Sequence, residues 1–250
     1  MKFRFSDLLI FALLFIFVAA FPVDLFNIDA TYKLLIQISL RLLILVYYIY
    51  ICFINRINIF KFSNLTRALL FVPFLLACFS NLIAFGLDGA NSTGVTMCSG
   101  YLSLFIIYHF VGAVVEEFLF RLFIQSQLVK VGSIKRIFYG AMIFALFHLL
   151  NMVNISTVDG LVNVLIQVAY NFGLGILLGF VYEYTYSLPV CILLHFAFNF
   201  FNTVLYQYMG CVTSNFAFYL TAVVIALVLV IYTFLIYWFV LRRNDRYFKE

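Results

Sequence analysis

SLFIIYHFVGAVVEEFLFRLFIQSQL, residues 103–128, contains only three charged side chains, those of Glu116, Glu117 and Arg121. On membrane-insertion scales one charge at mid-bilayer costs about 3 kcal/mol, so the three cost about 8–10 kcal/mol before any pairing. The apolar remainder is long enough to cross the hydrocarbon core of a bilayer as a helix. A membrane helix therefore keeps this cluster only where the charges are paired, buried in a helix bundle or required for the function of the protein.

Similar apolar segments of about twenty residues recur along the whole chain. The chain has 250 residues, of which 66% are hydrophobic and 10% are charged, with a mean hydropathy of +1.14. This pattern predicts an all-α polytopic membrane protein, because a β-barrel would have shorter alternating segments. We expect a single integral membrane domain over 1–250, with about eight transmembrane helices in one bundle around an intramembrane active-site cavity. The expected spans are 8–26, 34–54, 68–87, 103–128, 137–153, 161–181, 188–209 and 218–241.

Twelve of the fifteen basic residues flank alternate spans, so the net charge of +5 implies no nucleic-acid partner. They are Lys2, Arg4, Arg56, Lys61, Arg67, Lys130, Lys135, Arg136, Arg242, Arg243, Arg246 and Lys249. The other connections carry Asp24, Asp29, Asp88 and Asp159, with Lys33 their only basic residue. The positive-inside rule then predicts cytoplasmic N- and C-termini, although the connection after the sixth span carries only Glu183.

The first span is expected to be retained as a helix, because no small-residue cleavage site follows it. A composition rich in Phe, Ile and Leu favours a bacterial plasma membrane. The five cysteines fit neither a disulfide framework nor a zinc spacing. Cys52, Cys78 and Cys191 are expected in apolar helices, whereas Cys98 and Cys211 share the outer face, where a disulfide between them is possible but not required.

Three short motifs place polar groups inside the spans: EEFLFR (116–121), FALFH (144–148) and HFAFN (195–199). Glu117 and Arg121 are four residues apart, nearly on one helix face, and are expected to form an ion pair. Glu116 and Arg121 are five apart and point about 140° away from each other. Glu116 is therefore left without a partner on its own helix.

The polar groups of the three motifs lie at similar depths. At 1.5 Å per residue, Glu116 lies about 20 Å, His148 about 18 Å, Asn199 about 15 Å and His195 about 9 Å from the cytoplasmic ends of their helices. A single His or Asn in a membrane helix is usually a packing or hydrogen-bonding residue. The set at matched depth instead predicts that a carboxylate, two imidazoles and an amide converge on one intramembrane pocket.

Three other polar residues are given structural roles. His109 lies two helical turns outward from Glu116 and is expected to be structural or pore-lining. Gln167 and Asn171, four residues apart on the sixth span, are expected to form interhelical hydrogen bonds, with some chance of lining the cavity.

This set of groups can support peptide hydrolysis without a covalent intermediate. A carboxylate and a neutral imidazole can hold a water molecule and accept its proton, while a second imidazole and an amide can donate to the oxyanion. Zinc is the rival use, with Glu116, His148 and His195 as ligands, but HExxH is absent. No cofactor is favoured, and zinc remains possible.

The motifs EExxxR, FxxxH and HxxxN, in this order on successive core spans, resemble the CPBP intramembrane protease family. This family includes the type II CAAX prenyl endopeptidases and the bacteriocin-processing Abi group. The resemblance covers about 103–202, which would be the catalytic core formed by spans four to seven. It implies that Glu117 and Arg121 correspond to the supporting pair of the family.

The resemblance also implies roles for the four remaining motif residues. Glu116 and His148 would activate the attacking water, while His195 and Asn199 would form the oxyanion site. The family was long classed as metalloproteases, and its members are better described as glutamate-dependent endopeptidases. The implied substrate is a membrane-associated peptide or protein, such as a CaaX-like protein or a pheromone or bacteriocin precursor.

Two alternative functions remain open. A non-catalytic bacteriocin-immunity or sensor-scaffolding membrane protein could keep these motifs for structure. A proton-coupled transporter could use intramembrane Glu, His and Arg as a relay, but the sequence has no inverted repeat or pair of Gly/Pro-broken helices of the transporter kind.

Overall fold

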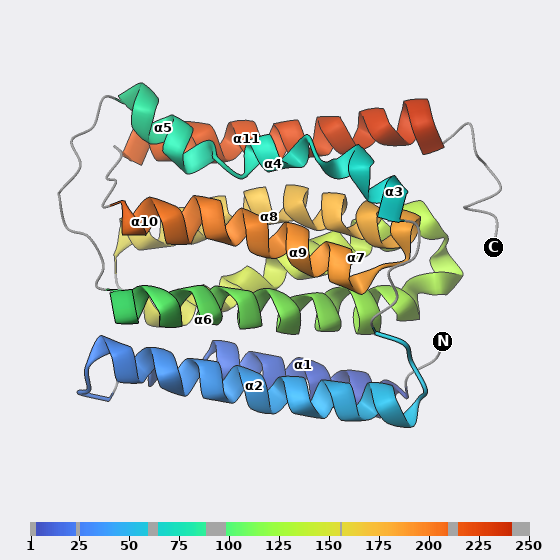
Figure 1. Cartoon of the computed structure of the whole chain (residues 1–250), viewed down its shortest axis with the longest axis horizontal. Coiled ribbons are helices and arrows are strands. Elements are labelled where there is room, and N and C mark those ends of the chain that lie inside the picture. The colour runs from blue at the N-terminus through green and yellow to red at the C-terminus, as the bar shows by residue number, and fades with distance from the viewer. Residues whose placement is uncertain are drawn as a thin grey trace.

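The computed structural model describes residues 4–23, 26–59, 65–88, 99–155, 157–209 and 215–241, and the regular elements within these ranges are all helices. Figure 1 shows the helices running along one common axis in layers. The pair α1 (Phe5–Ala19) and α2 (Ala30–Ile54) forms one side, and α11 (Asn215–Ile236) lies on the opposite side. The three sequence motifs lie in the helices between these two layers.

Within these described ranges, six helical segments are long and apolar enough to cross a membrane, which supports an integral multi-pass membrane protein. They are Ala30–Ile54, Gly100–Gln125, Ser133–Val153, Val158–Thr185, Leu188–Tyr208 and Tyr219–Phe239. Each coincides with an expected span, so the all-α prediction is confirmed.

Several of these segments combine two or three kinds of helical turn. They are α6 (Ser99–Glu117) with the π-helical η3 (Phe118–Gln125), α7 (Ser133–Phe147) with the 3₁₀-helical η5 (His148–Asn154), α9 (Leu188–Asn199) with the π-helical η6 (Phe200–Leu205) and α10 (Tyr206–Tyr208), and α11 with the π-helical η7 (Tyr237–Leu241).

The first and third expected spans differ from the prediction. Helix α1 has 15 residues, or about 22 Å, which is shorter than a hydrocarbon core of about 30 Å. The third span is broken into α3 (Leu65–Ala68), η2 (Leu69–Phe71), α4 (Phe74–Ala77) and α5 (Ser80–Asp88). Pro73 lies at one of these breaks and has no N–H to donate to the preceding turn. In Figure 1 the pieces still follow one another alongside α11.

Glu183 is not the connection residue that the sequence indicated. Helix α8 (Val158–Thr185) continues past it and ends at Thr185, followed by Tyr186, whose φ of 52° is left-handed. The buried Glu183 carboxylate accepts a hydrogen bond from Arg136 Nη2 at 2.7 Å. The ion pair explains how a charge can be kept inside this part of the bundle.

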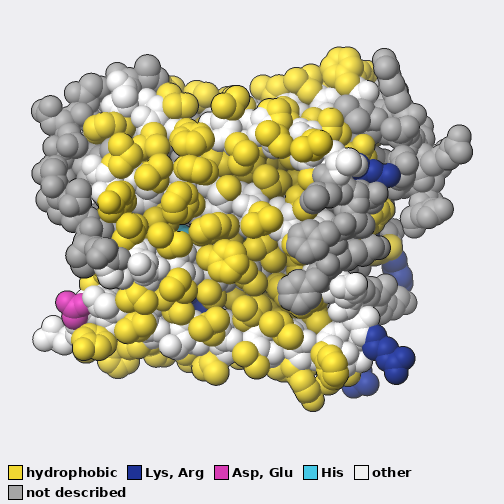
Figure 2. Space-filling model, viewed as in Figure 1, with side chains coloured by type: hydrophobic (Ala, Val, Ile, Leu, Met, Phe, Trp, Pro, Cys, Tyr) yellow, Lys and Arg dark blue, Asp and Glu magenta, His cyan; other side chains and the backbone are white. Residues whose placement is uncertain are grey.

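The face of the bundle shown in Figure 2 is largely apolar. Large side chains such as Leu43, Phe53, Leu227 and Phe234 are more than half exposed. Figure 2 also shows Lys and Arg side chains gathered at one end of the molecule, the end at which α2 terminates in Figure 1. An apolar belt with a charged end is the surface expected of a protein embedded in lipid.

The cysteines that the structure describes are buried. Cys52, Cys78 and Cys191 are free thiols within the bundle, as expected for small hydrophobic residues. Cys98 and Cys211 lie outside the described residues, so the disulfide considered between them stays a prediction.

Helix α8 packs very closely against its neighbours at two glycines. A Cβ atom on Gly173 would lie 3.0 Å from the Ala226 carbonyl oxygen of α11, and one on Gly175 would lie 3.0 Å from Ala141 Cα of α7. These contacts are with backbone atoms or a short side chain, which cannot move aside. The close approach of α8 to both helices therefore requires glycine, as is common between membrane helices.

We predict that Gly173→Leu lowers the stability of the bundle by at least about 1–3 kcal/mol, because the added side chain overpacks the interface between α8 and α11. The measurement is denaturant-induced unfolding of the purified protein in detergent. Gly86→Leu in α5 is the matched control, since nothing lies within 4 Å of a Cβ atom at that position. Equal unfolding curves for the two variants would contradict the prediction.

Candidate active site

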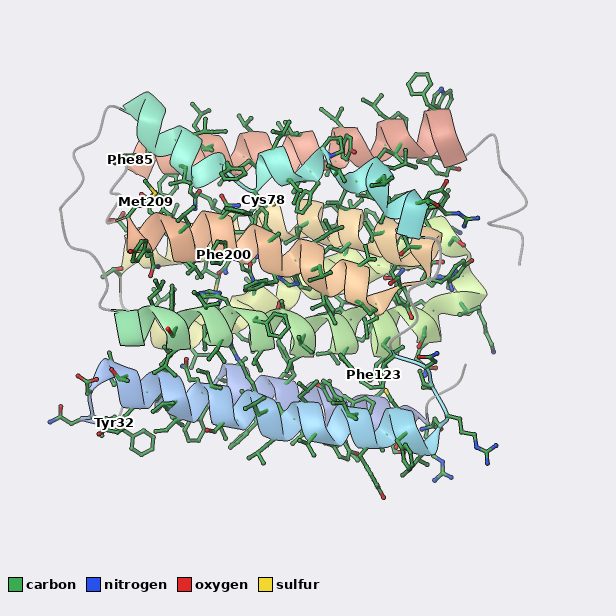
Figure 3. All side chains as sticks on the ribbon, viewed as in Figure 1. Tyr32, Cys78, Phe85, Phe123, Phe200 and Met209 are labelled. Carbon is green, nitrogen blue, oxygen red and sulfur yellow. The ribbon has the colours of Figure 1, made fainter. Side chains whose placement is uncertain are left out.

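The three sequence motifs border one cavity of about 380 Å³. Glu116 reaches it from α6, His148 from the start of η5, and His195 and Asn199 from α9. The structure thus brings the four predicted catalytic side chains to the same internal space. Figure 3 shows side chains filling the layer between α6 and α9, with Phe200 marking the start of η6 and Phe123 lying in η3 near one end of the bundle.

The helices change their hydrogen-bonding pattern next to each motif. Regular α-helix ends at Glu117, at Phe147 and at Asn199, and π- or 3₁₀-helix follows each time. Such irregular turns widen or tighten the helix and often occur at functional sites. Here the change begins within the first two motifs and directly after the third, and it alters the direction of the side chains that follow without breaking the helix.

His148 is held in one tautomer by its own helix. Its Nδ1 lies 3.0 Å from the Phe144 carbonyl oxygen, which can only accept a hydrogen bond. Nδ1 therefore carries the proton, and Nε2 is left with a free lone pair. A neutral imidazole in this state can act as a base toward a group in the cavity.

Glu117 connects the motif on α6 with the motif on α9. One of its carboxylate oxygens lies 3.0 Å from Arg121 Nε, and the other lies 2.8 Å from His195 Nδ1. The side chains of Glu117 and Arg121 are completely buried. The expected pair of Glu117 with Arg121 is present, and the carboxylate also orients the His195 ring, which the sequence did not indicate.

Glu116 is the more open carboxylate of the pair. Its side chain is 20% exposed, and its Oε2 lies 3.8 Å from His195 Nε2, beyond hydrogen-bond distance. No described side chain or backbone group is hydrogen bonded to it. Glu116 is therefore available to a molecule in the cavity, whereas Glu117 is fully engaged.

The polar contacts continue from Arg121 toward the end of the bundle. Arg121 Nη1 lies 3.5 Å from Gln125 Oε1, and Gln125 Nε2 donates to Glu183 Oε1 at 2.8 Å. Glu183 then accepts from Arg136, which is partly exposed. These polar side chains form a connected row that leads to Glu117, the residue that holds the His195 ring. In this row each carboxylate is paired with an arginine, so the charges among the apolar helices are balanced.

The residues given structural roles by the sequence also border the cavity. His109 lines it and packs edge-on against the Phe105 ring at 4.6 Å between centroids. Gln167 accepts a hydrogen bond from Asn151 Nδ2 at 2.8 Å, which joins α8 to η5 as expected. Asn171 is buried and lines the cavity as well.

Sequence reasoning missed Arg41, which lines the cavity from α2. A signal was available, because Arg41 is a lone charge inside the apolar span 34–54 and should have been subject to the same cost argument as Arg121. It also missed Asn202, whose Oδ1 accepts hydrogen bonds from Ser80 Oγ and the Asn81 amide of α5. That contact attaches the broken third segment to the wall of the cavity.

The alternative zinc ligands Glu116, His148 and His195 border the same cavity. Among the described residues, no group of three His, Cys, Asp or Glu side chains is arranged to hold a metal ion. Nδ1 of His195 is engaged by Glu117 and Nδ1 of His148 by a backbone carbonyl, so Nε2 is the ring nitrogen that each could offer to a metal ion. The use of zinc therefore stays a prediction.

Residues 98–201 match the family model described as "Type II CAAX prenyl endopeptidase Rce1-like". This part of the chain belongs to the Rce1-like family. The match contains Glu116, His148, His195 and Asn199, and the resemblance to the CPBP family noted from the motifs is confirmed. Membership implies an intramembrane peptidase that acts on a peptide or protein. A comparison with curated proteins gave no significant match.

We predict that Glu117→Ala destabilises the Rce1-like segment by about 3–5 kcal/mol, because it leaves Arg121 as a buried charge without its carboxylate. Thermal unfolding in detergent measures the loss. Adding Arg121→Met to the same chain removes the unpaired charge and should restore most of the stability. A single variant that unfolds at the wild-type temperature would show that the pair is not needed for stability.

Proposed function

We propose that the protein is an intramembrane endopeptidase that hydrolyses a peptide bond with a water molecule activated by Glu116 and His148. The observation that carries this proposal is that an open carboxylate, Glu116, and an imidazole whose Nε2 is free, His148, border one cavity. A water held between them can lose its proton to either group as its oxygen attacks the carbonyl carbon. No side-chain nucleophile is required.

The oxyanion produced by this attack would be stabilised by His195 and Asn199. Asn199 can donate from its amide nitrogen, and His195 can donate from Nε2 when that atom carries a proton. Protonated His195 would be balanced by the surrounding charges, since two carboxylates, Glu116 and Glu117, would then face Arg121 and one imidazolium. Glu117 would fix the ring so that Nε2 is directed toward Glu116.

The reaction would finish without any covalent intermediate. The tetrahedral centre would collapse with cleavage of the C–N bond, and the proton taken from water would pass to the departing amine. Hydrolysis would release a carboxylic acid and an amine, and the base would return to its initial state. Glu117 and Arg121 would act as supporting residues throughout, because neither is open to the substrate.

The substrate would be a membrane-associated peptide or protein, such as a CaaX-like protein or a pheromone or bacteriocin precursor. We propose that 1–250 form one membrane domain with a catalytic core over 103–202. The six long helices would cross the bilayer, and α1 and the broken third segment would complete the eight expected passes as a short and an interrupted helix. Both termini would then lie in the cytoplasm of a bacterial cell. The apolar sides and the basic end of the bundle support this placement.

Glu116→Gln and His148→Ala are each predicted to lower the rate of cleavage by about 10²–10⁴-fold, the usual contribution of a general base. The measurement is hydrolysis of a membrane-tethered peptide library by the purified protein in lipid vesicles, followed by mass spectrometry. Asp159→Asn, at the exposed start of α8, is the matched removal of a carboxylate and should retain full activity.

Full activity of both site variants would overturn the proposal. The non-catalytic alternative, an immunity or sensor-scaffolding protein, predicts that Glu116→Gln keeps the cellular phenotype. Proton-coupled flux in vesicles would instead identify a transporter.

A further inference from the structure

Arg41 places on the cavity a cationic group that the proposed reaction does not use. It lies in α2, about 16 Å along the helix from its first residue. Arg41 Nη1 donates to the Tyr108 carbonyl oxygen at 3.1 Å, and Nη2 donates to the Tyr108 hydroxyl at 2.8 Å. The guanidinium also stacks over the Tyr108 ring at 3.8 Å from its centroid. These contacts hold the guanidinium in a fixed orientation at the cavity wall.

No carboxylate among the described residues is within ion-pair distance of Arg41. Glu117 is bound to Arg121, and Glu116, although open, has its nearest described ionisable partner in His195 at 3.8 Å. A guanidinium has five N–H donors, and the contacts with Tyr108 use two of its nitrogens. A cation kept at this depth without a partner costs about 3 kcal/mol or more. An anion bound to the Arg41 guanidinium would offset this cost.

The position of Arg41 relative to Glu116 is set by Gly112. A Cβ atom on Gly112 would lie only 2.9 Å from Arg41 Nη1, so the guanidinium rests directly on the backbone of α6. Gly112 precedes Glu116 by one helical turn, or about 6 Å. Arg41, Gly112 and Glu116 also line a small second void beside the cavity. The cation and the proposed base therefore face the same space at a separation that a short peptide can bridge.

We propose that Arg41 binds the C-terminal carboxylate of the peptide substrate and thereby sets the distance from the chain end to the cleaved bond. Guanidinium and carboxylate groups form paired, charge-assisted hydrogen bonds of high specificity. His109 adds a second polar group on this side, since its buried Nε2 has no hydrogen-bond partner within the described ranges. An extended chain advances about 3.3 Å per residue, so a terminal carboxylate at Arg41 places a bond a few residues upstream at Glu116.

This inference rests on the proposed function, and a binding measurement separates the two. Peptides identical except for a free acid or an amide at the C-terminus are bound to the inactive Glu116→Gln protein in nanodiscs. We expect the acid to bind at least about 10-fold more tightly than the amide. In Glu116→Gln with Arg41→Gln the ratio should fall to about 1. Equal affinity for acid and amide in the Glu116→Gln protein would overturn the proposal, whether or not the wild type cleaves peptides.

A second pair of variants tests the geometry rather than the charge. Gly112→Ala changes no charge, but the added methyl group displaces the Arg41 guanidinium from its position against the backbone of α6. The acid preference should therefore fall several-fold, although alanine is the better helix former. Lys130→Gln removes one positive charge from an exposed position outside the cavity and should leave the preference unchanged. An unchanged preference in Gly112→Ala, or its loss in Lys130→Gln, would contradict the role of Arg41.

The source of the bound carboxylate is tested with one further peptide. An amidated peptide that carries an added Asp near its end supplies a side-chain carboxylate in place of the terminal one. If Arg41 binds only the C-terminal carboxylate, this peptide should bind as weakly as the amidated peptide without the added Asp. Binding as tight as that of the free acid would show that Arg41 accepts any carboxylate and would overturn its assignment to the C-terminus.

Discussion

The buried carboxylate of Glu117 is the interaction on which the rest of the site depends. It binds Arg121 on its own helix and His195 on α9, so it joins two helices through side chains that are 78 residues apart in the chain. Because all three groups lie away from water, none can be removed without leaving another unsatisfied. Glu116, the next residue, is directed into the cavity and remains open. The two adjacent glutamates therefore have different roles: Glu117 is held by its partners, and Glu116 is available to a molecule in the cavity.

The parts of the fold that the sequence predicted are those that depend on local pattern. Runs of apolar residues were enough to place the six long helices, and the spacing of four was enough to pair Glu117 with Arg121. The depth argument brought Glu116 and His148 to the same space because helical rise is nearly constant. The family motifs then agreed with this geometry over the matched segment.

The parts that the sequence did not predict depend on packing between distant segments. The contact of His195 with Glu117 and the row through Gln125 to Glu183 require α6 with η3, α8 and α9 to meet at a particular register. The breaks in the third span arise from several short turns around Pro73. Hydropathy does not reveal them, because the whole segment is one continuous apolar stretch. Arg41 was visible as a lone charge, but only the structure shows which cavity it reaches.

The π-helical turns of η3 have a consequence for how the sequence can vary. A π-helical turn holds more residues than an α-helical one, which is equivalent to one residue inserted into a regular helix. Loss of a single residue between 118 and 125 would restore the regular pattern and rotate the residues after the deletion by about 100° relative to those before it. Gln125 would then turn away from Glu183 while Glu116 kept its direction. Chain length within this segment is therefore constrained as tightly as residue identity, so related sequences should align across it without gaps.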